Sequence, residues 1–150
     1  MRIFLVILMA LTCGRIAAQP TGDAAGVQFR AVDIYVDSKQ QPLAAYQLEF
    51  SVTNAASAAK IVGIEGGETP AYSEPPFYDP QAMQHERVVI AAFSTNAVSN
   101  LPTGKTRVAT IHLQTARAVE SEFELKLEAA ADSNGNRIPA EPSVEERKTK

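Results

Sequence analysis

Apolar and polar residues alternate strictly along Leu43–Thr53. The apolar positions on one parity are Tyr46, Leu48, Phe50 and Val52, and the positions between them are Ala45, Gln47, Glu49 and Ser51. Alternation of this kind, rich in aromatic and β-branched residues, is typical of a strand with one face in a core and one toward solvent. A helix would scatter the four apolar residues around its circumference. The pattern therefore predicts a strand, around which the rest of the chain can be placed.

Similar short segments lie on both sides of this strand. We expect strands over Val27–Asp37, Ile61–Ile64, Arg87–Thr95, Arg107–Thr115 and Glu122–Ala131, with a last short strand starting at Arg137. Turn residues separate these segments, and Asn134-Gly135 favours a tight turn because positive φ costs little there. No segment has the apolar spacing of a long helix. The pattern predicts an all-β fold, an antiparallel sandwich or barrel.

Two of the expected strands differ in how clearly their faces can be assigned. In Glu122–Ala131 the alternation places Phe123, Leu125, Leu127 and Ala129 inward, and Glu122, Glu124, Lys126 and Glu128 outward. In Arg87–Thr95 both parities are apolar, with Val88, Ile90 and Ala92 on one side and Val89, Ala91 and Phe93 on the other. Such a strand is either covered on both faces or presents an apolar patch to a partner. The sequence leaves open which parity faces outward.

The segment Glu65–Glu86 is irregular and contains four prolines. Prolines at this density exclude a central strand, while Asp79-Pro80 favours the start of a short helical turn. Long irregular segments in compact domains are often functional. This one is either a lid over one end of the core or a binding loop.

The N-terminus has the layout of a secretory signal peptide. A basic start is followed by the apolar run Ile3–Thr12 and then by small residues, and the run is too short to span a bilayer. We expect residues 1–18 to be removed after Ala18 and the protein to be secreted, periplasmic or on the cell surface. The only cysteine, Cys13, lies in this segment, and its context matches a lipoprotein anchor poorly.

The remaining chain divides into a linker (19–26), one domain (27–139) and a flexible, Pro-, Glu- and Lys-rich tail (140–150). Cleavage would remove Arg2 and Arg15 from 14 basic residues, leaving 12 against 17 acidic residues and a formal net charge of −5. A surface of this sign repels phosphate backbones and disfavours nucleic-acid binding. No transmembrane stretch is expected in the mature chain.

No catalytic constellation is recognisable. The mature chain would contain no thiol, and His85 and His112 lack metal-ligand spacing. Asp132, Asn134 and Asn136 match the first ligand positions of a calcium loop, but Arg137 stands where the glycine belongs, so a plain turn is the better interpretation. We expect no metal, no cofactor and no catalytic residue.

Beyond these patterns, the order of segments from about Val32 to Ile138 resembles a cohesin domain. The matching segments are Val-Asp-Ile-Tyr-Val-Asp, Leu-Ala-Ala-Tyr-Gln-Leu-Glu-Phe-Ser-Val, Lys-Ile-Val-Gly-Ile-Glu-Gly, Arg-Val-Val-Ile-Ala-Ala-Phe-Ser, Gly104–Leu113 and Asp-Ser-Asn-Gly-Asn-Arg-Ile. The chain departs from the family at Ala44-Ala45, which replaces a glycine step, and at Asn54, where Asp-Pro is common.

Cohesins are jelly-roll β-sandwiches without catalytic activity that bind dockerin modules through one sheet face. The resemblance implies a secreted or cell-envelope interaction module with a protein partner, for which a dockerin-like module is one candidate. Its partner face would include Gln47, Glu49, Ser51, Val89, Ala91 and Phe93. The alternative is a carbohydrate-binding module of the same architecture, with Tyr72, Phe77 and Tyr78 stacking on a polysaccharide.

Overall fold

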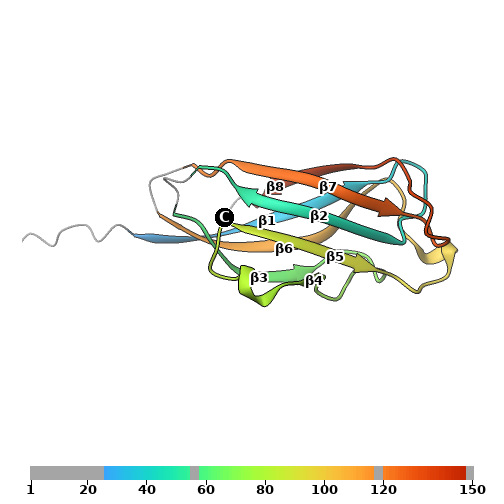
Figure 1. Cartoon of the computed structure of the whole chain (residues 1–150), viewed down its shortest axis with the longest axis horizontal. Coiled ribbons are helices and arrows are strands. Elements are labelled where there is room, and N and C mark those ends of the chain that lie inside the picture. The colour runs from blue at the N-terminus through green and yellow to red at the C-terminus, as the bar shows by residue number, and fades with distance from the viewer. Residues whose placement is uncertain (1–25, 55–57, 117–119, 148–150) are drawn as a thin grey trace, which may run out of the picture.

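Two four-stranded antiparallel sheets face each other (Figure 1). The computed structural model describes residues 26–54, 58–116 and 120–147. Sheet A has the order β3-β6-β1-β8, formed by Lys60–Gly66, Lys105–Ala116, Val27–Asp37 and Glu141–Glu146. Sheet B has the order β4-β5-β2-β7, formed by Phe77–Tyr78, Arg87–Phe93, Ala45–Val52 and Phe123–Ala131. The predicted antiparallel β-sandwich is confirmed.

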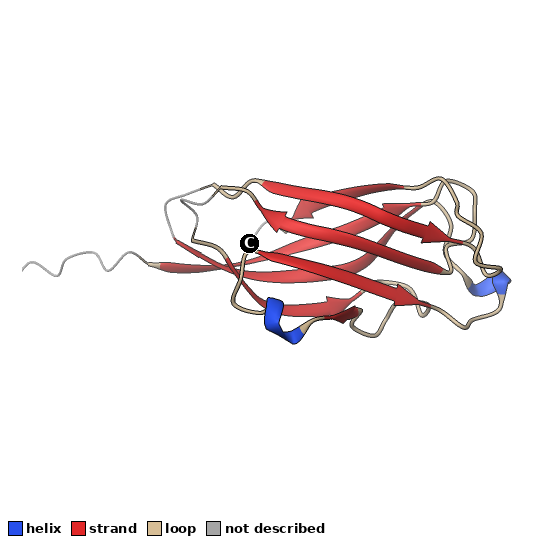
Figure 2. Cartoon of the chain, in the orientation of Figure 1, coloured by secondary structure: helices blue, strands red, loops and turns tan. Residues whose placement is uncertain are grey.

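Helical structure in the described part is limited to two short 3-10 turns, η2 (Pro80–Ala82) and η3 (Val98–Asn100) (Figure 2). The side chain of Asp79 accepts a hydrogen bond from the backbone N–H of Gln81, so the predicted helical turn after Asp79 forms as η2. Among the described residues, no helix has the length and apolarity needed to cross a membrane.

The core lies between the sheets and is filled by the alternating residues of β1, β2, β5 and β6. From β2, Tyr46, Leu48, Phe50 and Val52 are all at most 5% exposed, as their parity predicts. Phe50 also stacks on Phe123 of β7, with ring centroids 5.7 Å apart. Facing them from sheet A are Val32, Ile34, Val36, Ile111 and Leu113, each fully buried. Removing this apolar area from water is the main force that holds the two sheets together.

A β-bulge in β7 changes which of its residues face the core. Leu48 pairs with Leu127 but Gln47 pairs with Ala129, so Glu128 is an extra residue between them. Beyond the bulge the parity reverses: Ala130 is 3% exposed, and Ala129 lies on the outer face beside Gln47. The prediction that Ala129 faces inward is wrong for this reason.

The C-terminal segment also differs from expectation. Residues 140–150 were expected to form a flexible tail, but Glu141–Glu146 forms β8, which pairs with Val32–Asp37 of β1. The segment lacks a run of apolar residues because it is an edge strand held by backbone pairing, by Val144 against the core and by charged contacts. Residues 148–150, the expected signal peptide, Cys13 and nearly all of the expected linker lie outside the described residues.

One charged contact of this C-terminal segment reaches a buried carboxylate. Arg147 donates from Nε to Oδ2 of Asp33 on β1 at 2.8 Å, and the Thr110 hydroxyl donates to Oδ1 at 2.7 Å. Burial alone would raise the pKa of Asp33, but these hydrogen bonds, with the positive charges of Arg147 and Arg107, outweigh it and hold that pKa below its usual value. The contact therefore links the end of the chain to the centre of sheet A.

The irregular segment between β3 and β5 closes one end of the core. Tyr72 is 3% exposed, its ring meets that of Tyr46 edge-on at 5.3 Å, and its hydroxyl donates to the Leu43 carbonyl at 2.7 Å. A Cβ on Gly66 would lie 2.1 Å from the backbone oxygen of Ser73, so only glycine fits where the loop folds back. Of the two interpretations left open, the lid describes this part of the loop.

Candidate functional site

The outward parity of β5 is settled by burial. Val88 and Ile90 are 1% and 0% exposed, whereas Val89 and Phe93 are 38% and 64% exposed. Strand pairing places Gln47 beside Ala91, Glu49 beside Val89 and Ser51 beside Arg87. Cross-strand neighbours project to the same side of a sheet. All six residues of the expected partner face therefore share one surface, which we call the outer face of sheet B.

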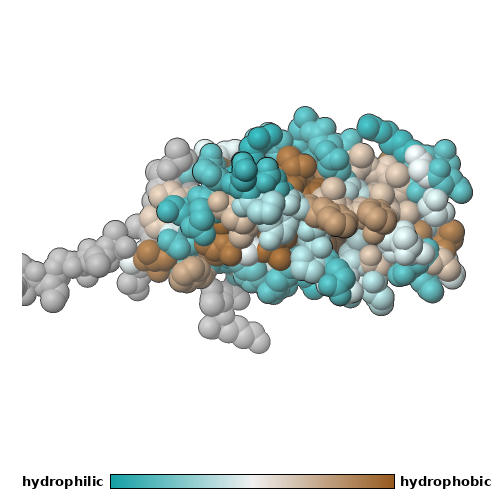
Figure 3. All heavy atoms as spheres, turned by 60° about the horizontal axis from the view of Figure 1, so that its bottom comes forward, coloured by the Kyte–Doolittle hydropathy of each residue, from teal (hydrophilic) through white to brown (hydrophobic). Residues whose placement is uncertain are grey.

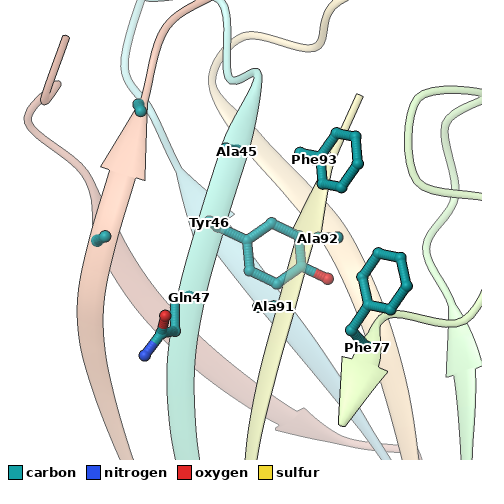
Figure 4. Close-up of a pocket in the computed structure, with 9 residues that line it drawn as sticks. Ala45, Tyr46, Gln47, Phe77, Ala91, Ala92 and Phe93 are labelled. Atoms are coloured by element: carbon teal, nitrogen blue, oxygen red, sulfur yellow. The ribbon is translucent and has the colours of Figure 1, made fainter. Parts of the chain in front are cut away.

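Phe77 adds a second aromatic side chain to this face. It belongs to β4, pairs with Ala91 and is 68% exposed. Its ring stacks on that of Phe93, with centroids 6.0 Å apart and planes inclined by 11° (Figure 4). Single exposed apolar side chains are common on protein surfaces, but two aromatic rings in contact form a continuous apolar patch that another molecule can cover.

Beside the two rings the face is hollowed by small side chains. A shallow cavity of about 260 Å³ has Phe77 and Phe93 along one side, and it is also lined by Gln47 and by four outward-facing alanines, namely Ala45, Ala91, Ala129 and Ala131. We call this cavity the alanine trough. Ala129 reaches it only because of the bulge in β7. On the side of the molecule drawn in Figure 3, apolar surface lies in several patches that are separated by hydrophilic surface.

The opposite end of the same face is charged. Arg87 donates to both carboxylate oxygens of Glu49, with Nε–Oε1 and Nη2–Oε2 distances of 2.7 and 2.5 Å. These hydrogen bonds, with the charge of the guanidinium, hold the pKa of Glu49 below its usual value. On β7, Lys126 pairs with Glu128 at 2.6 Å. Each cation on this end is thus matched by a carboxylate.

Two further carboxylates at that end are exposed and have no cationic partner within the described part of the chain. Glu124 pairs across the ladder with Ser51, and Glu122 precedes β7 next to Thr53, whose N–H donates to the Glu122 carbonyl. The outer face of sheet B is therefore apolar at the Phe93 end and carries a net negative charge at the Glu124 end.

The three aromatic residues expected for the carbohydrate alternative do not form one site. Tyr72 is buried in the lid and cannot stack on a sugar ring, so its proposed role is wrong. Tyr78 is partly buried and packs against the core. Phe77 is exposed, but it belongs to the outer face of sheet B with Phe93. No sequence signal distinguished the buried tyrosine from the exposed phenylalanine.

The calcium-like motif is a hydrogen-bonded turn in the structure. Oδ1 of Asp132 accepts from the backbone N–H groups of Asn134 and Asn136 at 2.9 Å each, and Oδ2 accepts from Nδ2 of Asn136 at 3.1 Å. These bonds hold the pKa of Asp132 below its usual value. Within the described ranges no three His, Cys, Asp or Glu side chains gather as metal ligands would.

The two histidines lie apart from the outer face of sheet B. His112 is on β6 of sheet A, where its Nε2 lies 3.0 Å from Oε1 of Glu65, and His85 is in the loop before β5. The surface to which sequence, pairing and exposure all point is therefore one sheet face with no recognisable catalytic group.

Comparison with solved structures gives a neighbour of the same architecture. A chain in the crystal structure of a type I cohesin–dockerin complex from Clostridium thermocellum superposes with a TM-score of 0.56 and 14% sequence identity. The fold is cohesin-like. The superposition covers 75% of this chain and 82% of that chain. No family model and no characterised protein matches the sequence.

Proposed function

We propose that this chain is a secreted, non-catalytic interaction module that binds a protein partner through the outer face of sheet B. The observation that carries the proposal is the exposed Phe77–Phe93 pair beside the alanine trough. Aromatic side chains in contact with a hollow supply the anchor of many protein interfaces, because covering them removes a large apolar area from water.

The cohesin-like fold supports this proposal further. The solved complex that this chain resembles is described as a cohesin–dockerin complex, so a dockerin-like module is a specific candidate partner. The expected signal peptide supports an encounter outside the cytoplasm, in the cell envelope or beyond. A polysaccharide is the competing ligand, since exposed aromatic rings also stack on sugars.

The test uses two phenylalanines that match in type and exposure. Phe93 on the outer face of sheet B is 64% exposed, and Phe29 on β1 of sheet A is 66% exposed. Each would be changed to Asp, and far-UV circular dichroism would check that both variants fold. Wild type and both variants would then be used to capture envelope and secreted proteins of the source organism, in parallel with binding to purified dockerin modules and to a glycan array.

We expect wild type and Phe29→Asp to capture the same partner, which mass spectrometry would identify. Once purified, this partner should bind Phe93→Asp at least about tenfold more weakly than wild type. Loss of binding with Phe29→Asp but not with Phe93→Asp would place the interface on sheet A and refute the proposal. Glycan binding that is lost in Phe93→Asp, without protein capture, would favour the carbohydrate module instead.

A further inference from the structure

The two ends of the outer face of sheet B have different chemistry, and this difference restricts what can bind there. Paired residues run across the sheet in rows, which are Phe93–Ala45–Ala131, Phe77–Ala91–Gln47–Ala129, Val89–Glu49–Lys126 and Arg87–Ser51–Glu124. The first two rows form the alanine trough with its aromatic side. The last two rows hold charged side chains. A partner that covers the face must therefore complement an apolar end and a polar end.

The alanine trough accepts a side chain rather than a flat surface. Its lining consists of alanine side chains with Gln47 among them, one side is the stacked Phe77–Phe93 pair, and its volume is about 260 Å³. A Leu-, Met- or Phe-sized side chain is small enough to enter this space, where it would contact both the alanines and the aromatic rings. Filled pockets of this kind supply most of the energy of an interface.

At the other end the partner meets unmatched negative charge. Arg87 is engaged by Glu49 and Lys126 by Glu128, which leaves Glu122 and Glu124 without cations among the described residues. An acidic partner would be repelled here, whereas Lys or Arg would be attracted and would accelerate association at low salt.

The separation of the two ends follows from the strand rise. Ala45 and Ser51 lie six residues apart on β2, which corresponds to about 20 Å at about 3.3 Å per residue. The same length is about 13 residues of an α-helix or about six residues of extended chain. One short segment of a partner can therefore reach both ends.

We infer that the partner of this face presents one large apolar side chain to the alanine trough and basic side chains to Glu122 and Glu124, about 20 Å away. This inference rests on the proposed function and deepens it, because it names the recognition chemistry and the orientation. Ala91 determines specificity at the trough, where it leaves room for the apolar side chain. Glu124 determines specificity at the acidic end, where it attracts the basic side chains. Neither side chain is part of the core.

Selection of random 16-residue peptides displayed on phage tests the inference without a known partner. The library would be selected on the immobilised full chain and depleted on the Phe93→Asp variant, so that only peptides that depend on the outer face of sheet B remain. The recovered peptides would be synthesised and their affinities measured for wild type, Ala91→Leu and Glu124→Lys. Ala31→Leu is the matched control, since Ala31 is also partly exposed on a central strand but belongs to sheet A.

We expect recovered peptides to share a large apolar residue and an excess of Lys and Arg over Asp and Glu. Ala91→Leu, which places a larger side chain in the trough, should weaken binding of these peptides about tenfold or more, and Glu124→Lys should weaken it about threefold or more. Ala31→Leu should leave their affinity unchanged. If no peptide distinguishes wild type from Phe93→Asp, the proposed binding face itself is wrong. If such peptides are recovered but are acidic, or bind Ala91→Leu like wild type, the inference is refuted while the proposed function stands.

Discussion

The orientation of β5 can be tested by truncating two of its side chains separately. Ile90 is fully buried between the sheets, and Phe93, three residues later on the opposite face, is 64% exposed. By sequence alone the two positions are equivalent, because both parities of this strand are apolar. We predict that Ile90→Ala strongly destabilises the protein and that Phe93→Ala does not.

The size of the difference follows from what each side chain loses. Ile90→Ala removes buried methyl and methylene groups and leaves a cavity in the core, which costs about 2–5 kcal/mol. Phe93→Ala loses mainly its stacking on Phe77, which is about 0.5–1.5 kcal/mol. The core truncation removes a large part of a total stability of about 5–15 kcal/mol.

Urea unfolding followed by far-UV circular dichroism measures both values. With an m-value of about 1.5 kcal/mol per molar, a loss of 3 kcal/mol for Ile90→Ala lowers the midpoint by about 2 M, and Phe93→Ala lowers it by less than about 1 M. Equal midpoints for the two variants, or a lower midpoint for Phe93→Ala, would show that the assigned faces of β5 are wrong.

Three further predictions concern the parts that hold the sandwich closed. Asp33→Asn should lower stability at pH 7 by about 2 kcal/mol, because hydrogen bonds to a charged group are lost. Since the folded pKa of Asp33 lies below its unfolded value, its stabilisation is full above about pH 5 and is lost as pH falls through the folded pKa. Wild-type urea midpoints should therefore fall more steeply below about pH 4 than those of Asp33→Asn, and parallel curves would contradict this assignment. Deleting residues 141–150 should lower the urea midpoint at pH 7 more than Asp33→Asn does, because β8 and Arg147 are both lost, and an unchanged midpoint would mean that β8 is dispensable. Gly66→Ala should cost about 3 kcal/mol in thermal or urea unfolding, because its Cβ would clash with the Ser73 backbone, and a neutral result would show that the loop can shift.

Most of the fold was predictable because a half-buried strand repeats its environment every two residues. Tyr46, Leu48 and Phe50 are buried, as their alternation requires, and the strands predicted between Val27 and Ala131 form within a few residues of the expected limits. The short strand predicted to start at Arg137 does not form, since Arg137 makes only an isolated bridge with Ala131. Patterns failed where that repeat is broken. The extra residue Glu128 reverses the parity of β7, and no local signal of a bulge precedes Ala129.

Strands at the edge of a sheet, and strands that are apolar on both faces, show a second limit of sequence patterns. β8 carries little apolar character because it is held by pairing with the backbone of β1, and Arg147, which follows it, binds the carboxylate of Asp33; a hydrophobicity pattern reports neither contact. In β5 both parities are apolar because one faces the core and the other lines an exposed surface. Only the packing of Val88 and Ile90 decides between them.

The candidate site was therefore only partly predictable. The six residues inferred from the cohesin resemblance do share one face, since strand register keeps outward residues of adjacent strands together. Phe77, Ala129 and Ala131 were missed as members of that face. Phe77 lies in the proline-rich loop and joins sheet B through a strand of two residues, which is too short to predict. The two alanines depend on the bulge.

An NMR titration of the isotope-labelled chain with a purified protein partner tests the central claim most directly. The account predicts that amide shifts change mainly on the strands of sheet B, at and around Gln47, Phe77, Ala91 and Phe93, while the outer face of sheet A is unaffected. Shift changes concentrated on β1, β6 and β8 would contradict the claim that the outer face of sheet B is the recognition surface.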